Sequence, residues 1–301
     1  MNKSLKSEIQ VKDYDLTLVR YFPNAAVTLH EVKVPDSQNK NTLLEAKELA
    51  FRFGLFSLFG SRMKISSMLI KDGAMFVYVD KSGNANYDVL KETESMGNEE
   101  TSELSIKLEE AEMQDVELIY VNEQSKQDAR ILINEVNMSG EFSGNRFALK
   151  SDAFFETEFF ETEDGRYFAG KEIRYEADVD VDLAKEIYKF NNVSLHIEEN
   201  KFSIGGEVKK DGKNYDYNLN FDGKDCSLQS LIGLLPNGYV EDLVGLESRG
   251  DFTFEGEVKG KSGDKKLPAI NVELGLEDGR ISGPQLESPL RDVTFTANFT
   301  N

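Results

Sequence analysis

The sequence predicts an all-β protein with minor α content, arranged as an elongated and mostly antiparallel sheet. Apolar and polar residues alternate with a period of two through most segments, and the run 177–183, ADVDVDL, does so without a fault. The chain has 20 Phe and 11 Tyr but no Trp, and these aromatic residues favour strands. Short runs rich in Gly, Asn, Asp and Ser separate the alternating segments and predict turns.

The N-terminal third is read as successive strands with interruptions. In residues 5–21 the apolar phase slips once, between Val11 and Tyr14, which predicts a β-bulge. A second slip falls at His30 and Glu31, within the strand predicted for 27–34. Further strands are predicted over 43–53, 63–70 and 74–79. Because Asp72-Gly73 separates the last two runs, it predicts a hairpin with a type I′ turn.

The remainder of the chain continues the strand pattern. Residues 116–118 are predicted to pair with 131–133 across a turn at 123–125. The segments 135–152 and 192–208 resemble each other, each being a strand, a turn with Asn and then Phe-x-Leu or Phe-x-Ile. Such a tandem of hairpin-sized units indicates a repeat architecture that grows along one axis. The tandem FFETE-FFETE at 154–163 indicates an irregular core strand, with an aromatic lining as the alternative.

Helix is predicted only in short pieces, at 55–59, 86–91, 183–190 and 227–246. The last window is a helical pair, in which Pro236-Asn237-Gly238 ends the first helix. An acidic stretch at 92–103 is predicted to be a mobile loop. It divides the chain into an N-terminal unit, 1–91, and a continuing sheet, 104–301.

The composition and motifs disfavour or exclude several classes of partner, metal site and enzyme. Net charge is −20, from 55 acidic and 35 basic residues, which disfavours nucleic acid and anionic lipid surfaces. The chain has one cysteine, Cys226, and two histidines, His30 and His196, so a disulfide scaffold and a Cys-rich metal site are excluded. No phosphate loop, dinucleotide fingerprint or nucleophile elbow is present. We therefore expect no enzymatic activity, no cofactor and no metal.

Residues 43–90 carry a resemblance to a known family. They read LLEAKELAFRFGLFSLFGSRMKISSMLIKDGAMFVYVDKSGNANYDVL. This stretch resembles the N-terminal region of the AsmA family of bacterial envelope proteins, and the upstream pieces 11–23 and 27–34 fit the same pattern. The resemblance is good over about residues 11–90, weaker over 226–301 and diffuse between them.

The resemblance implies an architecture and a setting rather than a reaction. It implies a long curved sheet folded into a groove that is apolar inside and polar outside. It also implies a periplasmic protein of a Gram-negative bacterium, anchored to the inner membrane by a helix upstream of Met1. Members of the family are implicated in outer-membrane assembly and resemble bridge-like lipid-transfer proteins in shape. The chain is accordingly expected to lack its anchor and to be truncated at its C-terminus.

The expected function is lipid binding and transport between the inner and outer membranes. Acyl chains would lie along the apolar face, where burial stabilises them by roughly 0.8 kcal/mol per CH₂. Alternation places the following candidates for lipid contact on that face: Leu16, Leu18, Val27, Leu29, Ile65, Met75, Val77 and Val79.

Three alternatives remain open at this point. The protein could be a scaffold or chaperone that engages outer-membrane proteins through strand edges, without lipid. It could be an ordinary closed β-sandwich pair whose apolar face is all core. It could also be a hydrolase of envelope polymers, although no catalytic constellation is visible. A groove and a closed core require the same alternation, so the sequence does not separate them.

Overall fold

The computed structural model describes residues 8–18, 24–37, 41–54, 63–89, 104–142, 144–163, 165–212, 214–226, 245, 247–263, 267–284 and 286–301. The described residues form β-strands, turns and bends, and none of them is helical. The predicted all-β class is therefore confirmed.

The strands form an ordered series. Their bounds are β1 (Asp13–Thr17), β2 (Asn24–Pro35), β3 (Thr42–Gly54), β4 (Met63–Val79), β5 (Leu104–Asn122), β6 (Gln127–Ser139), β7 (Arg146–Thr162), β8 (Gly165–Tyr167), β9 (Lys171–Asp182), β10 (Ile187–Ile197), β11 (Asn200–Asp211), β12 (Asn214–Cys226), β13 (Glu247–Ser262), β14 (Ala269–Ser282) and β15 (Leu290–Thr300). Hydrogen-bonding order follows chain order from β1 to β15, except that β8 pairs with β7 alone. The order does not return on itself, so the sheet is open.

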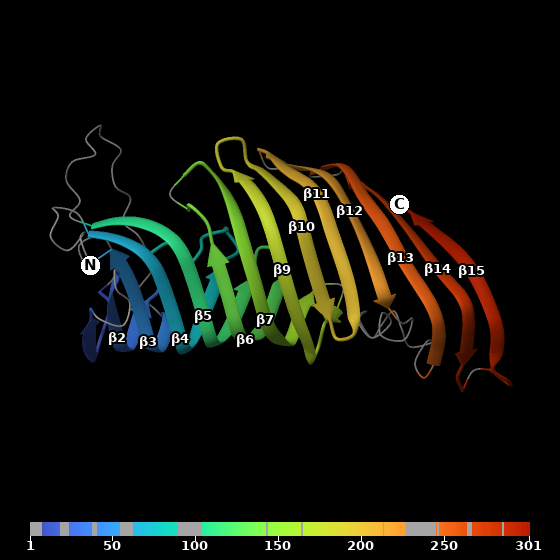
Figure 1. Ribbon diagram of the computed structural model, residues 1–301, viewed down its shortest axis with the longest axis horizontal. Helices are drawn as coiled ribbons and strands as arrows, with labels where there is room; N and C mark the ends of the chain where they lie inside the picture. Colours follow the sequence, from blue (N-terminus) through green and yellow to red (C-terminus); the bar gives the residue numbers. More distant parts are fainter. Residues whose placement is uncertain are drawn as a thin grey trace. The chain divides into compact units, whose positions relative to one another are not determined.

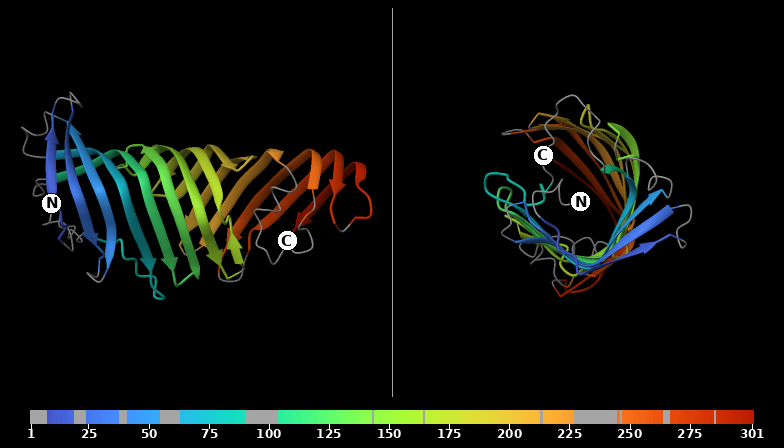
Figure 2. Two further views of the ribbon diagram at one scale, coloured as in Figure 1. Left: turned by 90° about the horizontal axis from the view of Figure 1, so that it is seen from below. Right: turned by 90° about the vertical axis from the view of Figure 1, so that its left-hand side faces the viewer.

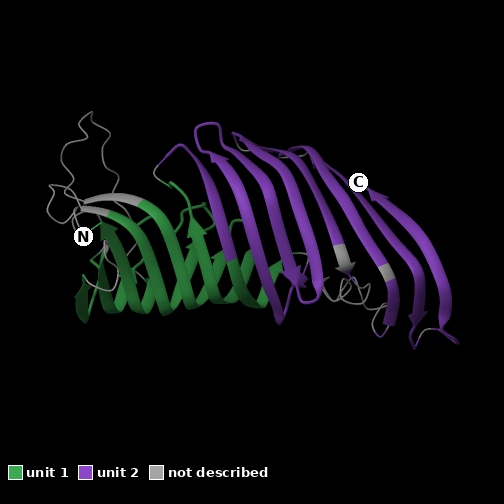
Figure 3. Ribbon diagram, viewed as in Figure 1, with its two compact units in different colours: residues 1–143, 153–163 green, residues 144–152, 164–301 purple. Residues whose placement is uncertain are grey.

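Two compact units make up the chain (Figure 3). Unit 1 comprises residues 1–143 and 153–163, and unit 2 comprises residues 144–152 and 164–301. The division falls within β7, so the strands on both sides of the acidic stretch 92–103 belong to unit 1; that stretch itself lies outside the described residues. In each unit the strands lie side by side and bend along their length (Figures 1 and 2).

Within unit 1 the sheet is antiparallel except at one place. β4 and β5 run parallel, with Met75 opposite Leu118 and Val77 opposite Tyr120. Parallel neighbours need a connection that returns the chain to the starting end of the sheet, and residues 80–103 form it. The pairings from β1 to β4 and from β5 to β6 are antiparallel, as are those of unit 2 from β9 to β15. The predicted pairing of 116–118 with 131–133 is confirmed, since Val116 lies opposite Ile133.

The hairpin predicted at Asp72-Gly73 is wrong. β4 runs unbroken through this dipeptide, and Asp72 has a φ of 52°. The dipeptide lies inside the strand as a local irregularity with positive φ rather than as a turn, because β3 and β5 both continue past it as partners without a change of register. The slip predicted at His30 and Glu31 is confirmed by the φ of 51° at Glu31.

Two of the predicted helical pieces fall on described residues, and both are wrong there. In the window 86–91, residues 86–89 form a turn and coil, while 90–91 lie outside the described residues. In the window 183–190, a turn leads directly into β10 at Ile187. The windows 55–59 and 227–246 lie outside the described residues, apart from Gly245, which is in a turn.

The segment after β4 folds back onto the end of that strand. The Asn86 side chain accepts a hydrogen bond from the Tyr78 amide at 2.9 Å and donates one to the Phe76 carbonyl at 2.8 Å. Asn86 is only 2% exposed. It therefore satisfies backbone groups that β3, which begins opposite Met75, does not reach.

Candidate functional site: the apolar face

One face of unit 1 is apolar from strand to strand. Residues that lie opposite each other on neighbouring strands project from the same face of a sheet, so the registers define rows across it. Four rows cross unit 1: Leu16, Val27, Phe51, Met68, Ala111 and Met138; Tyr14, Leu29, Leu49, Ile70, Met113 and Val136; Val32, Ala46, Gly73, Val116 and Ile133; and Val34, Leu44, Met75, Leu118 and Ile131. We call this surface the apolar face of unit 1.

The apolar face of unit 1 continues across a row of phase slips, which occur at matching positions of neighbouring strands. Between the second and third rows, each of five strands carries two successive polar residues instead of one. These pairs are His30 and Glu31, Lys47 and Glu48, Lys71 and Asp72, Gln114 and Asp115, and Asn134 and Glu135. The backbone has positive φ at Glu31, Asp72 and Asp115. The extra residue restores the apolar phase, so alternation resumes with the next apolar side chain on the same face.

Unit 2 has an apolar face of the same kind. Its rows are Val181, Tyr188, Val208, Tyr217 and Gly260; Val179, Phe190, Gly206, Leu219, Val258 and Ile270; Ala177, Val193, Ile204, Phe221, Gly256, Val272 and Phe299; and Tyr175, Leu195, Phe202, Gly223, Phe254, Leu274 and Ala297. A last row holds Cys226, Phe252, Leu276 and Phe295. We call this surface the apolar face of unit 2.

On the apolar face of unit 2, phenylalanine rings cover neighbouring glycine positions. A Cβ at Gly256 would lie 2.4 Å from the Phe221 ring, and a Cβ at Gly223 would lie 3.2 Å from the Phe202 ring. The Phe221 ring lies 5.4 Å from that of Phe254, which meets Phe202 edge to face at 6.0 Å. The rings thus fill the places that glycine leaves open, and the apolar surface is unbroken there.

The opposite face of unit 2 is polar. The row next to Phe221 consists of Glu176, Ser194, Ser203, Asp222, Glu255, Glu273 and Asn298. Ion pairs are present on this face, such as Lys261 to Asp211 at 2.9 Å. The hydrogen bond between them raises the pKa of Lys261 and lowers the pKa of Asp211. The sheet therefore separates an apolar surface from a charged one.

Strand contacts show how far the apolar faces are covered. Within each unit, the extensive contacts between described strands join hydrogen-bonded neighbours. These contacts do not join strands across the apolar face, yet Val32, Leu49 and Val116 on that face are only 0% to 3% exposed. Even so, large side chains on edge strands are open to solvent, with Leu16 55% and Phe299 58% exposed.

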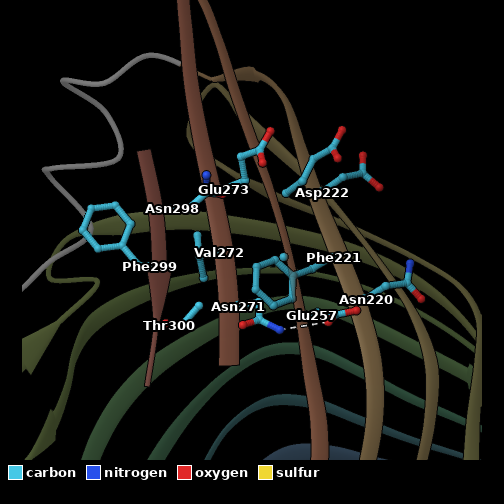
Figure 4. A pocket seen from close by; sticks show the side chains of 12 residues that line it. Asn220, Phe221, Asp222, Glu257, Asn271, Val272, Glu273, Asn298, Phe299 and Thr300 are labelled. Carbon is cyan, nitrogen blue, oxygen red and sulfur yellow. Dashed lines mark hydrogen bonds between the residues drawn. The ribbon is translucent and has the colours of Figure 1, made fainter. Parts of the chain in front are cut away.

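A hollow of unit 2 lies on the polar side of the sheet. It has a volume of about 560 Å³ and crosses β12 to β15. Figure 4 shows its lining, including Phe221, Val272 and the hydrogen bond of 2.9 Å from the Asn271 amide to Glu257. Eight of its twelve lining residues belong to the polar face: Asn220, Asp222, Glu255, Glu257, Asn271, Glu273, Asn298 and Thr300. This hollow is too polar to hold an acyl chain, so the apolar face itself is the candidate site.

The residues predicted for lipid contact gather on the apolar face of unit 1. Leu16, Val27, Leu29 and Met75 lie in its rows, and Ile65 pairs with Phe53 at one end of the face. Val77 and Val79 continue the face beyond Met75, with Val77 opposite Tyr120. Leu18 lies just past the end of β1, in a bend, and is 42% exposed.

The sequence prediction missed the apolar face of unit 2. Leu219, Phe221 and Phe254 occupy the same kind of position as Leu29 or Met75, and alternation in β12 and β13 marks them. The candidates were limited to the N-terminal segment, where the family resemblance is strongest. The alternation alone could have identified the rest.

Comparison with known proteins does not assign the chain to a family. No family model, no curated protein and no solved structure matches the chain. Within the described ranges, no three or more His, Cys, Asp and Glu side chains are grouped so as to hold a metal ion. None of the described residues belongs to a helix of the length and apolar character needed to span a bilayer.

Proposed function

We propose that the apolar face binds the acyl chains of lipids and that the protein transports phospholipid between the inner and outer membranes of a bacterial envelope. The observation that carries the proposal is the unbroken set of apolar rows in each unit, which on edge strands leaves large side chains such as Leu16 and Phe299 more than half exposed. A sheet that is apolar on one face must bury that face against something. Monomeric soluble proteins rarely expose a contiguous apolar patch larger than a few hundred Å² unless that patch binds a partner.

Burial gives the interaction its strength. Each CH₂ group removed from water contributes roughly 0.8 kcal/mol, so a chain of about twelve buried CH₂ groups gains roughly 10 kcal/mol before the cost of ordering it. Successive apolar rows offer similar surroundings at each step. A lipid that slides from one row to the next keeps nearly the same burial, so no large barrier opposes its movement.

The setting of the proposal rests on the family resemblance of residues 11–90. AsmA-like proteins place such a sheet in the periplasm and hold it at the inner membrane by an N-terminal helix. We extend that setting to this chain, with envelope proteins as possible partners. The proposal involves no enzymatic step and no cofactor.

A second candidate function uses the sheet edges. Among the described residues β15 pairs with β14 alone, which leaves its other edge without a neighbouring strand. An extended segment of an outer-membrane protein could add to that edge through backbone hydrogen bonds. This scaffold function needs no lipid, so a lipid-binding experiment separates the two candidates.

Two adjacent residues on opposite faces test the lipid proposal. Leu219 belongs to the apolar face and lies opposite Gly206 and Val258, whereas Asn218 projects to the polar face and lies opposite Glu207. We expect Leu219→Glu to lower crosslinking to a phospholipid with a photoreactive acyl chain by at least fivefold. Asn218→Glu adds the same charge on the other face and should crosslink like the unmodified protein.

Melting temperature decides what a loss of crosslinking means. On an open face the new carboxylate of Leu219→Glu reaches water, so the fold survives. In a closed core it would be buried without a partner, at a cost of several kcal/mol, and the domain would unfold. A folded Leu219→Glu protein that crosslinks as well as the unmodified one would refute the proposal.

A further inference from the structure

The apolar face of unit 2 changes character toward one end of its strands. The row holding Val179, Phe190 and Leu219 is followed by one in which Tyr188 and Tyr217 alternate with valines. Beyond it, Lys210 lies opposite Tyr215, and the Lys210 amide donates to the Glu186 carbonyl at 2.9 Å. Glu186, Lys210 and Tyr215 thus extend the same face, and with Tyr188 and Tyr217 we call them the Tyr–Lys–Glu rim.

The rim combines opposite charges with aromatic rings. The Lys210 ammonium donates to a Glu186 carboxylate oxygen at 2.8 Å, and the two side chains are 38% and 43% exposed. This hydrogen bond raises the pKa of Lys210. The Tyr215 and Tyr217 rings lie 6.2 Å apart, and Tyr215 is 39% exposed. Tyrosine is suited to such a boundary, because its ring is apolar and its hydroxyl is polar.

The other end of the face is different. There Ile173, Ile197, Cys226, Phe252 and Leu276 are between 1% and 6% exposed, and they carry no charge. A lipid is amphipathic in the same sense, with an apolar tail and a polar head. The gradient along the strands therefore gives a bound lipid one favoured direction, with its head at Lys210 and its tail on the partly exposed rows of Leu219 and Phe221, short of the buried cluster at Cys226.

We propose that the Tyr–Lys–Glu rim binds the headgroup of a zwitterionic phospholipid that carries a phosphate and a primary ammonium. This inference rests on the proposed lipid-binding function and adds the place and chemistry of the headgroup. Lys210 donates to the phosphate, and Glu186 accepts from the ammonium. Each partner of the Lys210–Glu186 pair exchanges its present hydrogen bond for one to the lipid, so no charge is left unpaired.

Charge complementarity favours this headgroup over an anionic one. The pair is neutral as a whole, and the chain around it has a net charge of −20. An anionic headgroup would satisfy Lys210 but would leave the Glu186 carboxylate unpaired beside a phosphate. A headgroup with both charges satisfies both side chains.

The experiment uses three probes with the same fluorescent acyl chain: a phosphoethanolamine lipid, a phosphoglycerol lipid and a free fatty acid. We expect the unmodified protein to bind the phosphoethanolamine lipid most tightly. Lys210→Met should weaken binding of both phospholipids about tenfold or more, the loss expected for a charge-assisted hydrogen bond. Glu186→Gln should weaken only the phosphoethanolamine lipid, and fatty-acid binding should stay within about twofold in both variants.

Lys261→Met is the matched control. Lys261 lies at the same end of unit 2, pairs with Asp211 at 2.9 Å and projects to the polar face opposite Asp216. We expect it to bind all three probes within about twofold of the unmodified protein. A melting temperature for each variant confirms that it is folded, which the exposure of these side chains favours.

The outcomes separate this inference from the function on which it rests. If the fatty acid binds but Lys210→Met leaves phosphoethanolamine binding unchanged, the headgroup site is refuted and acyl binding stands. A preference of the unmodified protein for the phosphoglycerol lipid also refutes the headgroup site. If none of the three probes binds, the proposed function fails and the headgroup site fails with it.

Discussion

Asn86 shows how a single side chain completes a strand edge. Its amide bonds to the backbone of Tyr78 and Phe76 at 2.9 and 2.8 Å, in the way that a neighbouring strand would. The backbone of Asn86 also accepts a hydrogen bond from Ser37 at 2.8 Å. The segment after β4 is therefore attached to two parts of unit 1 through one residue.

We predict that Asn86→Ala lowers the free energy of unfolding by about 1–3 kcal/mol. The substitution leaves a backbone amide and a carbonyl of β4 without partners in a site where Asn86 is 2% exposed. Asn84 is the control, because its side chain bonds to Asp80 at 2.8 Å on the exposed surface. Urea denaturation should show a change of less than about 1 kcal/mol for Asn84→Ala. Equal effects of the two substitutions would contradict this role of Asn86.

At the scale of the strand, the phase slip at Asp72 depends on a close approach between the backbones of β3 and β4. A Cβ at Gly73 would lie 2.3 Å from the Glu45 carbonyl oxygen and 3.1 Å from the Ala46 Cα. Both contacts are with the backbone of β3, which cannot move aside as a flexible side chain could. Glycine at this position lets β3 and β4 stay paired through the irregularity at Asp72.

We expect Gly73→Ala to destabilise unit 1 by roughly 2 kcal/mol, because the added methyl group forces β3 and β4 apart. Gly54→Ala is the matched control at the end of β3, where an added Cβ meets nothing within 4 Å. Thermal unfolding should leave that control unchanged or slightly more stable. This account of the close approach at Gly73 is wrong if Gly73→Ala melts at the same temperature as Gly54→Ala.

The strands could be predicted from the sequence because alternation is a local signal. The conformation of Asp72-Gly73 could not be predicted, since Asp and Gly tolerate positive φ both in a type I′ turn and inside a continuous strand. The continuation of β3 and β5 on either side decided between them. The window 183–190 failed for the same reason: Tyr188 is held in a strand by Val181 and Val208, which flank it in the sheet.

The sequence predicts that the candidate site is an apolar face of a sheet, but not how far that face extends. Seven of the eight N-terminal candidates lie on one face or continue it in the registers, and their contact with lipid stays a prediction. The parallel pairing of β4 with β5 left no trace in the sequence, because it depends on the path of the connecting chain. The Tyr–Lys–Glu rim was equally hidden, since Lys210 meets Glu186 and Tyr215 only through the registers of β10, β11 and β12.

At the scale of the molecule, one principle organises each unit: every strand presents its apolar residues to the same side. The phase slips of unit 1 and the glycines beneath Phe221 and Phe202 in unit 2 serve that arrangement. The result is an amphipathic layer whose apolar side needs a cover. Lipid is the cover that the proposed function assigns to it.

Native mass spectrometry tests that claim most directly. The protein is incubated with vesicles that contain phosphoethanolamine and phosphoglycerol lipids, repurified and sprayed intact. We predict adducts at the mass of one or more phospholipids on the unmodified protein and on Asn218→Glu, and markedly fewer on Leu219→Glu. A folded, unmodified protein that carries no lipid after this exposure would contradict the account.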